Sequence, residues 1–499
     1  MRRTCCALLC LAAMLAPPLP AIAATVWVTH AGDEPDPACP SDDRCTLRGA
    51  VAVAASGDEI RLAPSLGDHV EIELLSPLVM DRAIVLSVRG PGSDRLAIRP
   101  TGLFRVIVFE AGTTTLADLT LRDGAVIGAP GLAGSTPGAH GSHGGAVMGG
   151  CALLTGSAEV FLLRVALRQC TALGGDGGNG ASGLRQDRGA GGAGGNGGQG
   201  GEASGAAIAV FGNAKLDLRQ SSISESMAIG GHGGNGGRGG SGSLAGGPGG
   251  AGGRGGSAAG GGLLVYSLLP PNADALFALN VSLLGNGLGG GNGGAGGAGG
   301  QSTGAGPVGA AGQNGPAGDL SGGNLFHSPQ AAGRMTLFHA TLGPAMLERG
   351  VPGNWDGASA AGRSLVTGEV LWAGAWRVAA TVIVGASSFP PCAGAPPEAW
   401  MFSGTSAASD PGCLQEPLIV ADASDFLGSM ALRFEHGRAT ARPAHRSALV
   451  DSLVTCGANF DQSGRPRPLE GNGDDAAACD IGALEVAYST TIFADGFGD

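Results

Sequence analysis

A short apolar pattern recurs along this chain and constrains what the chain can fold into. An apolar residue is followed by others three and five positions later, first at Leu116, Leu119 and Leu121. The pattern returns, with one serine among its members, at four later places: Leu162, Val165 and Leu167; Leu218, Ser221 and Ile223; Ala278, Val281 and Leu283; Leu337, Ala340 and Leu342. The long intervals are explained if a core unit of about 30 residues carries a variable insertion at one fixed corner.

The insertions are runs of Gly-Gly-x triplets. Glycine accounts for 96 of the 499 residues, whereas an average protein has about 7%. The runs lie at Gly174–Gly205, Gly230–Gly262 and Gly285–Gly323, with a weaker one near Gly124–Gly150. They are either flexible linkers or ordered segments, extended strands or polyglycine-type helices. We expect order, because every insertion leaves the same corner and therefore lies beside the next.

The expected fold is all-β, a right-handed parallel β-helix (solenoid) with a short N-terminal capping helix and glycine-rich corner insertions. Short strand signals separated by turn residues run from Val70 to Gly124. A strand over Thr25–His30 precedes a short helix that Ser41, Asp42 or Asp43 could cap, with Leu47, Val51 and Ala54 on its apolar face. We expect the last full turn at residues 379–384 and a proline-rich, disulfide-tied loop over Pro390–Cys413.

The first 24 residues predict export. Arg2 and Arg3 precede an apolar stretch and then small residues, which is typical of a secretory signal cleaved after Ala23 or Ala24. Without Cys5, Cys6 and Cys10, eight cysteines remain, an even number that favours disulfides in an oxidising compartment. Sequence neighbours suggest the pairs Cys39–Cys45, Cys151–Cys170, Cys392–Cys413 and Cys456–Cys479, although spacing does not prove connectivity.

Two motifs resemble a known group of exported bacterial proteins. Residues 45–51, Cys-Thr-Leu-Arg-Gly-Ala-Val, resemble the CSLREA motif, with Gly49 where that family has Glu, and the strand Gly57-Asp58-Glu59-Ile60 resembles its next segment. Near the other end the chain resembles the terminal region of choice-of-anchor Q proteins, at Asp461, Gly464, Arg467, Pro468 and the run Asp480-Ile481-Gly482-Ala483-Leu484-Glu485. The resemblance implies a pectate-lyase-like β-helix. We expect Arg465 and Arg467 to form surface ion pairs near Asp461 and Glu470.

These signals divide the chain into five parts. They are a signal peptide at 1–24, a cap with the first turns at 25–124, turns with glycine-rich insertions at 125–350, the last turns and C-terminal region at 351–489, and a short tail at 490–499.

The composition limits the partners. A net charge of −12 argues against nucleic acid and anionic membranes, which attract Lys and Arg. No segment after the signal is long and apolar enough to cross a bilayer. We expect an unidentified surface, glycan or protein ligand, in the extracellular space or on the outer surface of a Gram-negative bacterium. The oligomeric state is left open.

Catalytic and metal-binding signals are sparse. The candidate acids are Asp118, Asp123, Asp176 and Asp187, and solvated turn residues are the simpler interpretation of them. The segment around Asp176 only superficially resembles a calcium-binding repeat, and His140 and His143 lack a third ligand nearby. We therefore expect no cofactor, with calcium as the alternative. The expected function is a non-enzymatic, adhesin-like or structural binding role; the alternatives are a polysaccharide lyase or hydrolase on the same scaffold, or a passenger tethered by other machinery.

Overall fold

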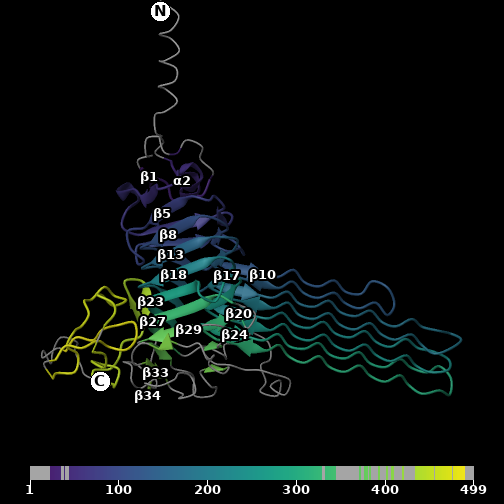
Figure 1. Ribbon diagram of the computed structural model, residues 1–499. Coiled ribbons are helices and arrows are strands. Elements are labelled where there is room, and N and C mark those ends of the chain that lie inside the picture. The colour runs from purple at the N-terminus through teal and green to yellow at the C-terminus, as the bar shows by residue number, and fades with distance from the viewer. Residues whose placement is uncertain are drawn as a thin grey trace, which may run out of the picture.

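The computed structural model describes residues 23–34, 39, 44–328, 332–343, 433–454, 456–474 and 476–488, with short segments between 370 and 420. Within these residues the protein is mostly β-structure in parallel sheets, and successive turns of the chain stack on one another (Figure 1). Long hairpins leave one corner of the stack, and the C-terminal segment covers another side in the same view (Figure 1).

The strands fall into columns, and each strand pairs in parallel with its equivalent one turn later. The first column comprises β1 (Thr25–Val28), β2 (Glu59–Leu62), β5 (Val85–Arg89), β8 (Thr113–Ala117), β13 (Glu159–Leu163), β18 (Lys215–Arg219), β23 (Asp274–Leu284), β27 (Arg334–Leu342), β29 (Trp376–Ala379) and β32 (Met401–Phe402). The second comprises β3 (Val70–Leu74), β6 (Leu96–Pro100), β9 (Thr120–Arg122), β14 (Ala166–Arg168), β19 (Ser222–Ser224), the later halves of β23 and β27, β30 (Val382–Ile383), β33 (Ser406–Ala408) and β34 (Leu418–Val420).

A third column forms a separate eight-stranded sheet: β4 (Leu78–Met80), β7 (Ile107–Phe109), β12 (Ala152–Leu154), β17 (Ile208–Gly212), β22 (Leu263–Ser267), β26 (Leu325–His327), β28 (Val370–Leu371) and β31 (Cys392–Ala393). Two four-stranded sheets flank the roots of the long hairpins: β10 (Ala125–Ile127), β15 (Thr171–Leu173), β20 (Met227–Ile229) and β24 (Gly287–Gly289); and β11 (Val147–Met148), β16 (Ala203–Ser204), β21 (Ala258–Ala259) and β25 (Leu320–Ser321). A 3-10 turn at Pro64–Leu66 and an antiparallel hairpin of β35 (Arg433–Glu435) and β36 (Arg438–Thr440) complete the described elements.

The recurring apolar pattern is the core of the stack. Its side chains in five successive turns are all buried, Ser221 included. Equivalent residues are 46, 56 and 60 positions apart in successive turns, as the bonded pairs Asp118–Arg164, Val165–Ser221 and Ser226–Asn286 show. The second hairpin absorbs the change from 46 to 56, because Ala125 pairs with Thr171 before it and Val147 pairs with Ala203 after it. The further lengthening to 60 lies between β22 and β23, and the pairing of β23 with β27 has one register irregularity, between Asp274 and Leu276.

A bend inside each pattern explains its uneven spacing. The residue that interrupts the first and second columns has a positive φ in every one of these turns: Asp118, Arg164, Gln220, Asn280 and His339. A left-handed residue at this point turns the chain so that the apolar residues on both sides face inward. Asp and Asn tolerate this conformation better than most residues do.

The N-terminal helix was expected correctly, but its cap was not. The helix α2 covers Leu47–Val53, and its N-cap is Thr46, whose hydroxyl accepts a hydrogen bond from the Gly49 amide. The earlier candidates, residues 41–43, lie outside the described residues. Arg48 of α2 donates to the Asp33 carboxylate and to the Pro77 carbonyl, so the helix is tied to the first turns.

Two expectations for the last turns were wrong. The strand β30 is not the final one, because β33 pairs with it and β34 pairs with β33. The stretch expected to be a loop over Pro390–Cys413 contains β31, β32 and β33, each in parallel register with an earlier strand. Short strands without strong apolar alternation gave no signal in the sequence.

Three of the suggested disulfides are present: Cys39–Cys45, Cys151–Cys170 and Cys456–Cys479. The suggested pair Cys392–Cys413 lies outside the residues whose side chains are described. No helix among the described residues is long and apolar enough to cross a membrane.

Removing one inward side chain should weaken the whole stack. Leu218 is fully buried in β18, so we expect Leu218→Ala to lower the free energy of unfolding by about 2–5 kcal/mol. The outward Lys215→Ala on the same strand is the matched control and should change it by less than about 1 kcal/mol. Urea unfolding followed by circular dichroism measures both; equal effects would contradict the inward packing of this strand.

Candidate functional site: a glycine double layer

Four glycine-rich hairpins project from one corner of the stack and lie parallel to one another (Figure 1). In each hairpin an outgoing segment and a returning segment run side by side in opposite directions. The outgoing segments form one layer and the returning segments form a second layer behind it. Backbone hydrogen bonds join the segments within each layer and between the layers. The glycine-rich insertions are therefore ordered segments and not flexible linkers.

The hydrogen bonds repeat every three residues. The first glycine of a triplet donates to the equivalent segment of the next turn, as Gly177 does to the His232 carbonyl at 2.7 Å. The second glycine donates to the other layer, as Gly234 does to the Gly198 carbonyl at 2.8 Å. Three residues per turn and bonds only to neighbouring segments are the features of polyglycine-type helices rather than of strands.

The crossing bonds form continuous zigzags through the double layer. At the root of the hairpins one such chain runs from Gly318 to Ala129, and every bond in it measures between 2.7 and 2.9 Å. Its donors, in order, are Gly318, Gly291, Gly256, Gly231, Gly201, Gly175 and Gly145. Each hairpin is thereby held to its neighbours in the adjacent turns.

Glycine is required because neighbouring carbonyl oxygens occupy the space of a side chain. A Cβ on Gly234 would lie 2.0 Å from the Gly178 oxygen, and one on Gly294 would lie 1.9 Å from the Gly234 oxygen. Real Cβ atoms essentially never come within 3.0 Å of another heavy atom. Two glycines in each triplet therefore face neighbouring segments, and the third residue faces outward.

In the outermost hairpins, residues other than glycine stand at positions that face no neighbouring segment. In the first hairpin, Ala129 and Leu132 occupy the phase that in the second hairpin is Gly175 and Gly178, which face them. Among the described residues no earlier glycine-rich hairpin lies beyond this edge, and Leu132 is 77% exposed. In the last returning segment Val308, Ala311, Asn314 and Ala317 occupy the phase that would face a further turn.

The outward residues complete the hydrogen bonding of the layers. Their own amides remain after the two glycines are paired, and side chains from the preceding turn accept from several of them. Asp176 accepts from the His232 amide at 2.7 Å, and the Nδ1 atom of His232 accepts from the Asn292 amide at 3.0 Å. Short acceptors at the third position, namely Asp, Asn and His, are the sequence signal for this arrangement, which the glycine periodicity alone does not reveal.

This arrangement accounts for three residues singled out in the sequence. The Nδ1 atoms of His140 and His143 accept from the Asn196 and Gln199 amides, at 2.7 and 2.8 Å. Asp176 belongs to the ladder on the other layer. All three side chains therefore accept hydrogen bonds from backbone amides of the double layer. Among the described residues no group of three or more His, Cys, Asp or Glu is arranged to hold a metal ion.

The other candidate acids each contact an arginine. Asp118 receives two hydrogen bonds from the guanidinium of Arg164, at 2.5 and 2.7 Å. Asp123 lies 3.3 Å from Arg122, and Asp187 is 3.1 Å from Arg185 near the tip of a hairpin. Each carboxylate thus has an arginine beside it.

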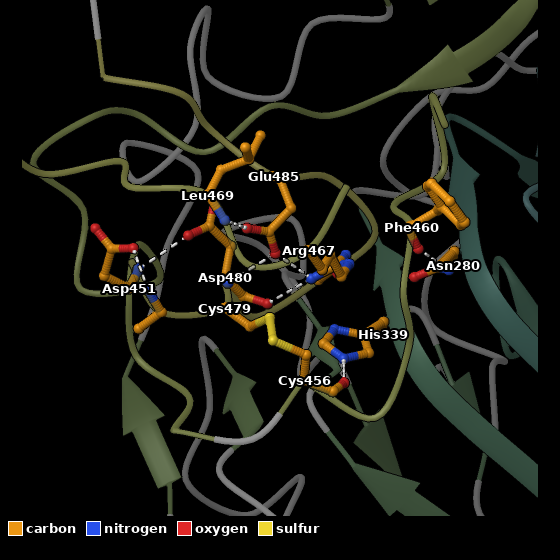
Figure 2. The surroundings of a disulfide bond; sticks show 12 residues. Asn280, His339, Asp451, Cys456, Phe460, Arg467, Leu469, Cys479, Asp480 and Glu485 are labelled. Atoms are coloured by element: carbon orange, nitrogen blue, oxygen red, sulfur yellow. Dashed lines mark hydrogen bonds and ion pairs between the residues drawn. A yellow bond between two sulfur atoms is a disulfide. The ribbon is translucent and has the colours of Figure 1, made fainter. Parts of the chain in front are cut away.

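A buried charged cluster lies in the C-terminal region, at the residues that carry the choice-of-anchor Q resemblance (Figure 2). Arg467 forms an ion pair with Glu485, and neither side chain has any exposed area. Arg467 also donates to the Gly482 carbonyl at 2.8 Å, while Glu485 accepts from the Asp480 and Leu469 amides. The expected surface ion pair of Arg467 is therefore wrong, because Arg467 points inward to an acid 18 residues later. The Nη1 atom of Arg465 donates to the Glu485 carbonyl at 3.4 Å.

The neighbouring carboxylates organise the same turns. Asp461 accepts from the amides of Arg465 and Glu485, at 2.7 and 3.0 Å. Asp480 accepts from the amides of Asp451 and Val486, at 2.9 and 2.7 Å. Burial raises the pKa of Asp480 to about 7 and that of Glu485 to about 8, and the nearby Arg467 opposes both shifts. Because Arg467, Glu485, Asp480 and Asp461 are buried, a substrate has no access to their charges, and their role is to hold the segment together.

The C-terminal segment docks on the column of left-handed bends. Gln220 and Asn280 donate side-chain hydrogen bonds to the carbonyls of Asp461 and Phe460, both at 2.7 Å. His339, next in the column, donates from Nε2 to the Cys456 carbonyl at 2.5 Å (Figure 2). One side chain per turn thus contacts the backbone of the docked segment.

Comparisons with known proteins give the chain no family. No family model matches it, and no curated protein matches its sequence. Similar solved structures include one titled "Crystal structure of pectate lyase Pel9A", which is 12% identical, covers 93% of this chain and 96% of its own, and has a TM-score of 0.33. Another, "Geobacillus virus E2 - ORF18", is 9% identical, covers 76% of this chain and 61% of its own, and has a TM-score of 0.25.

A methyl group at an inward position should open the double layer. We expect Gly294→Ala to disrupt the bonds of the third and fourth hairpins, because its Cβ would meet the Gly234 carbonyl. The adjacent Ala295→Ser is the matched control, since residue 295 is exposed. Hydrogen exchange of hairpin peptides should accelerate at least tenfold in the first variant and stay unchanged in the second. Unchanged exchange in both would contradict the tight packing.

Acid should weaken the docking of the C-terminal segment through His339. Burial, together with the nearby Arg467, lowers the pKa of His339 to about 4. Between pH 6.5 and 4 the unfolded chain therefore binds a proton that the folded chain does not, and this contribution to stability is lost at about 1.4 kcal/mol per pH unit. The raised pKa values of Asp480 and Glu485 act in the opposite direction, because their contribution to the stability of the folded protein is lost as the pH rises.

The variant His339→Asn separates the two effects, because Asn tolerates the left-handed bend and does not titrate. Thermal unfolding of both proteins from pH 4 to 8 should show that the advantage of the wild type shrinks below pH 6.5. Parallel pH profiles would show that His339 does not titrate in this way.

Proposed function

We propose that this is an exported, non-enzymatic surface or extracellular protein with an adhesin-like or structural binding role. The observation that carries the proposal is the glycine double layer. It adds nothing to the apolar core, yet the glycines of its triplets are bonded to neighbouring segments and the outward residues follow one another from turn to turn on both layers. A rigid, flat extension of this kind suits display to a partner better than chemistry.

The stack of turns is proposed to be a right-handed parallel β-helix. Parallel strands in three columns, each bonded to its equivalent one turn later, support this architecture. The hand follows from the general preference of connections between parallel strands, about 98% of which are right-handed.

We also propose that the chain is related to exported CSLREA and choice-of-anchor Q proteins. The residues that carry the resemblance have structural roles here: Thr46 caps α2, Arg48 joins α2 to the first turns, and Arg467 pairs with Glu485. The Gly49 departure leaves the helix in place, because the Thr46 hydroxyl accepts from its amide.

Export through the Sec pathway of a Gram-negative bacterium, to the cell surface or beyond, is proposed from two observations. Residues 1–24 have the composition of a secretory signal. The three disulfides suit an oxidising compartment.

A polysaccharide lyase or hydrolase on the same scaffold is the second candidate. The candidate acids argue against it, since Asp118 and Asp123 lie beside arginines and Asp176 serves the double layer. A glycosidase would need two carboxyl groups converging within about 5–10 Å on a substrate.

Removal of the double layer tests the proposed function. The four hairpins can be shortened by joining residues 128 to 145, 174 to 201, 230 to 256 and 290 to 318, because the two sides of each hairpin are adjacent at its root. We expect the intact protein to bind isolated bacterial envelopes or extracellular matrix, and the shortened protein to lose at least tenfold in binding while keeping its circular dichroism.

The same samples should be incubated with uronic-acid and neutral polysaccharides, and new chain ends measured. The proposal predicts no turnover. Rapid cleavage of any of these polymers would overturn it in favour of the enzyme, and equal binding by the shortened protein would show that the double layer is not the binding surface.

A further inference from the structure

A concave groove runs along the root of the double layer, where the returning segments join the eight-stranded sheet. Its volume is about 580 Å³, within the range usual for ligand sites. In each turn the chain passes from the short strand at the hairpin root to the eight-stranded sheet through a glycine with positive φ: Gly149, Gly205, Gly260 and Gly322. A column of left-handed glycines therefore makes the sharp corner between the two walls.

One wall is aromatic. The rings of Phe211 and Tyr266 stack with centroids 5.0 Å apart and an interplanar angle of 16°. They occupy the same register position of β17 and β22, and Phe326 of β26 extends the apolar surface beside Leu264. Phe211 is 39% exposed. Aromatic residues are only 4% of this chain, so three of them in one groove form an unusual concentration.

The other wall is polar and acidic. Glu202, Ser257 and Asp319 stand in one column, because the amides one residue further along, at Ala203 and Ala258, donate to the Ser257 and Asp319 carbonyls. Serine hydroxyls from several turns, Ser204, Ser321 and Ser328 among them, also line the groove. Asp319 forms an ion pair with Arg254, whereas Glu202 has no ion pair with any residue that the structure describes.

We propose that this groove binds a glycan chain that carries amino groups. Sugar rings present apolar C–H faces that pack on exposed aromatic rings, and their hydroxyl groups match the serines and carboxylates opposite. The groove follows the stacking direction of the turns, so a linear chain lies along it. The inference rests on the proposed binding function and names its ligand class.

The charge of the groove decides between kinds of glycan. Its lining residues include two carboxylates and no Lys, Arg or His. An anionic uronate chain would be repelled by Glu202, whereas an amino sugar would be attracted by it, since the charge of Asp319 is already balanced by Arg254. The ligand therefore differs from the acidic polysaccharides considered for an enzyme on this scaffold.

Titration calorimetry on the full chain tests the proposal, with a glucosamine hexamer, cellohexaose and a galacturonate hexamer as probes. We expect the glucosamine hexamer to bind with micromolar to millimolar affinity that weakens with salt, cellohexaose to bind more weakly, and the galacturonate hexamer not to bind. Phe211→Ala should weaken binding about three- to tenfold through loss of stacking. Glu202→Gln should weaken binding of the glucosamine hexamer about two- to fivefold and leave cellohexaose unchanged.

The matched control is Phe161→Ala, a partly exposed aromatic residue on a different sheet, which should bind as the wild type does. Circular dichroism and thermal unfolding confirm that each variant folds. The inference is overturned if the glucosamine hexamer does not bind, if Phe211→Ala and Glu202→Gln both bind it normally, or if galacturonate binds equally well. Envelope binding that persists without any oligosaccharide binding would sink this inference and leave the proposed function standing.

Discussion

The rest of this structure depends on the parallel register between equivalent residues of successive turns. The first strand column keeps the same partner positions from β8 to β27, apart from one irregularity between Asp274 and Leu276, although the turns differ in length. Because the register is constant, every insertion leaves the stack at the same height relative to its neighbour, about one strand spacing away. Glycine-rich segments that would be flexible alone are thereby held close enough for their backbone N–H and C=O groups to pair with one another.

The hydrogen bonds of the double layer offset the entropic cost of ordering so many glycines. Ordering glycine costs more conformational entropy than ordering any other residue. Here that cost is offset by hydrogen bonds at both glycines of each triplet, and by side-chain acceptors for many of the third amides. Asp176, Asn179 and Asn235 supply such acceptors from one turn to the next. The ladder also explains why the outward positions favour short polar residues over long charged ones.

Much of the stack could be predicted from the sequence, and the reasons are local. Leu116, Leu119 and Leu121 recur as a pattern because inward positions in every turn meet the same core, so periodicity reveals them. The glycine runs likewise indicated adjacent loops. The pairing of Arg467 with Glu485 was missed because burial is set by docking against distant turns, through Asn280 and His339. Strands β31 to β34 were missed because strands of two or three residues gain their stability from a neighbour already in place, which leaves little trace in their own residues.

The two outer edges of the double layer have a consequence for assembly. A stack made only of hairpins like the inner ones could grow without limit, because each hairpin presents to the next turn the same glycine surface that it meets on the turn before. At the first edge, however, Leu132 projects where a preceding segment would have to lie, and at the last edge Val308 does the same; both side chains are exposed. A second copy of the protein therefore cannot extend the double layer from either edge, and the double layer is confined to one chain.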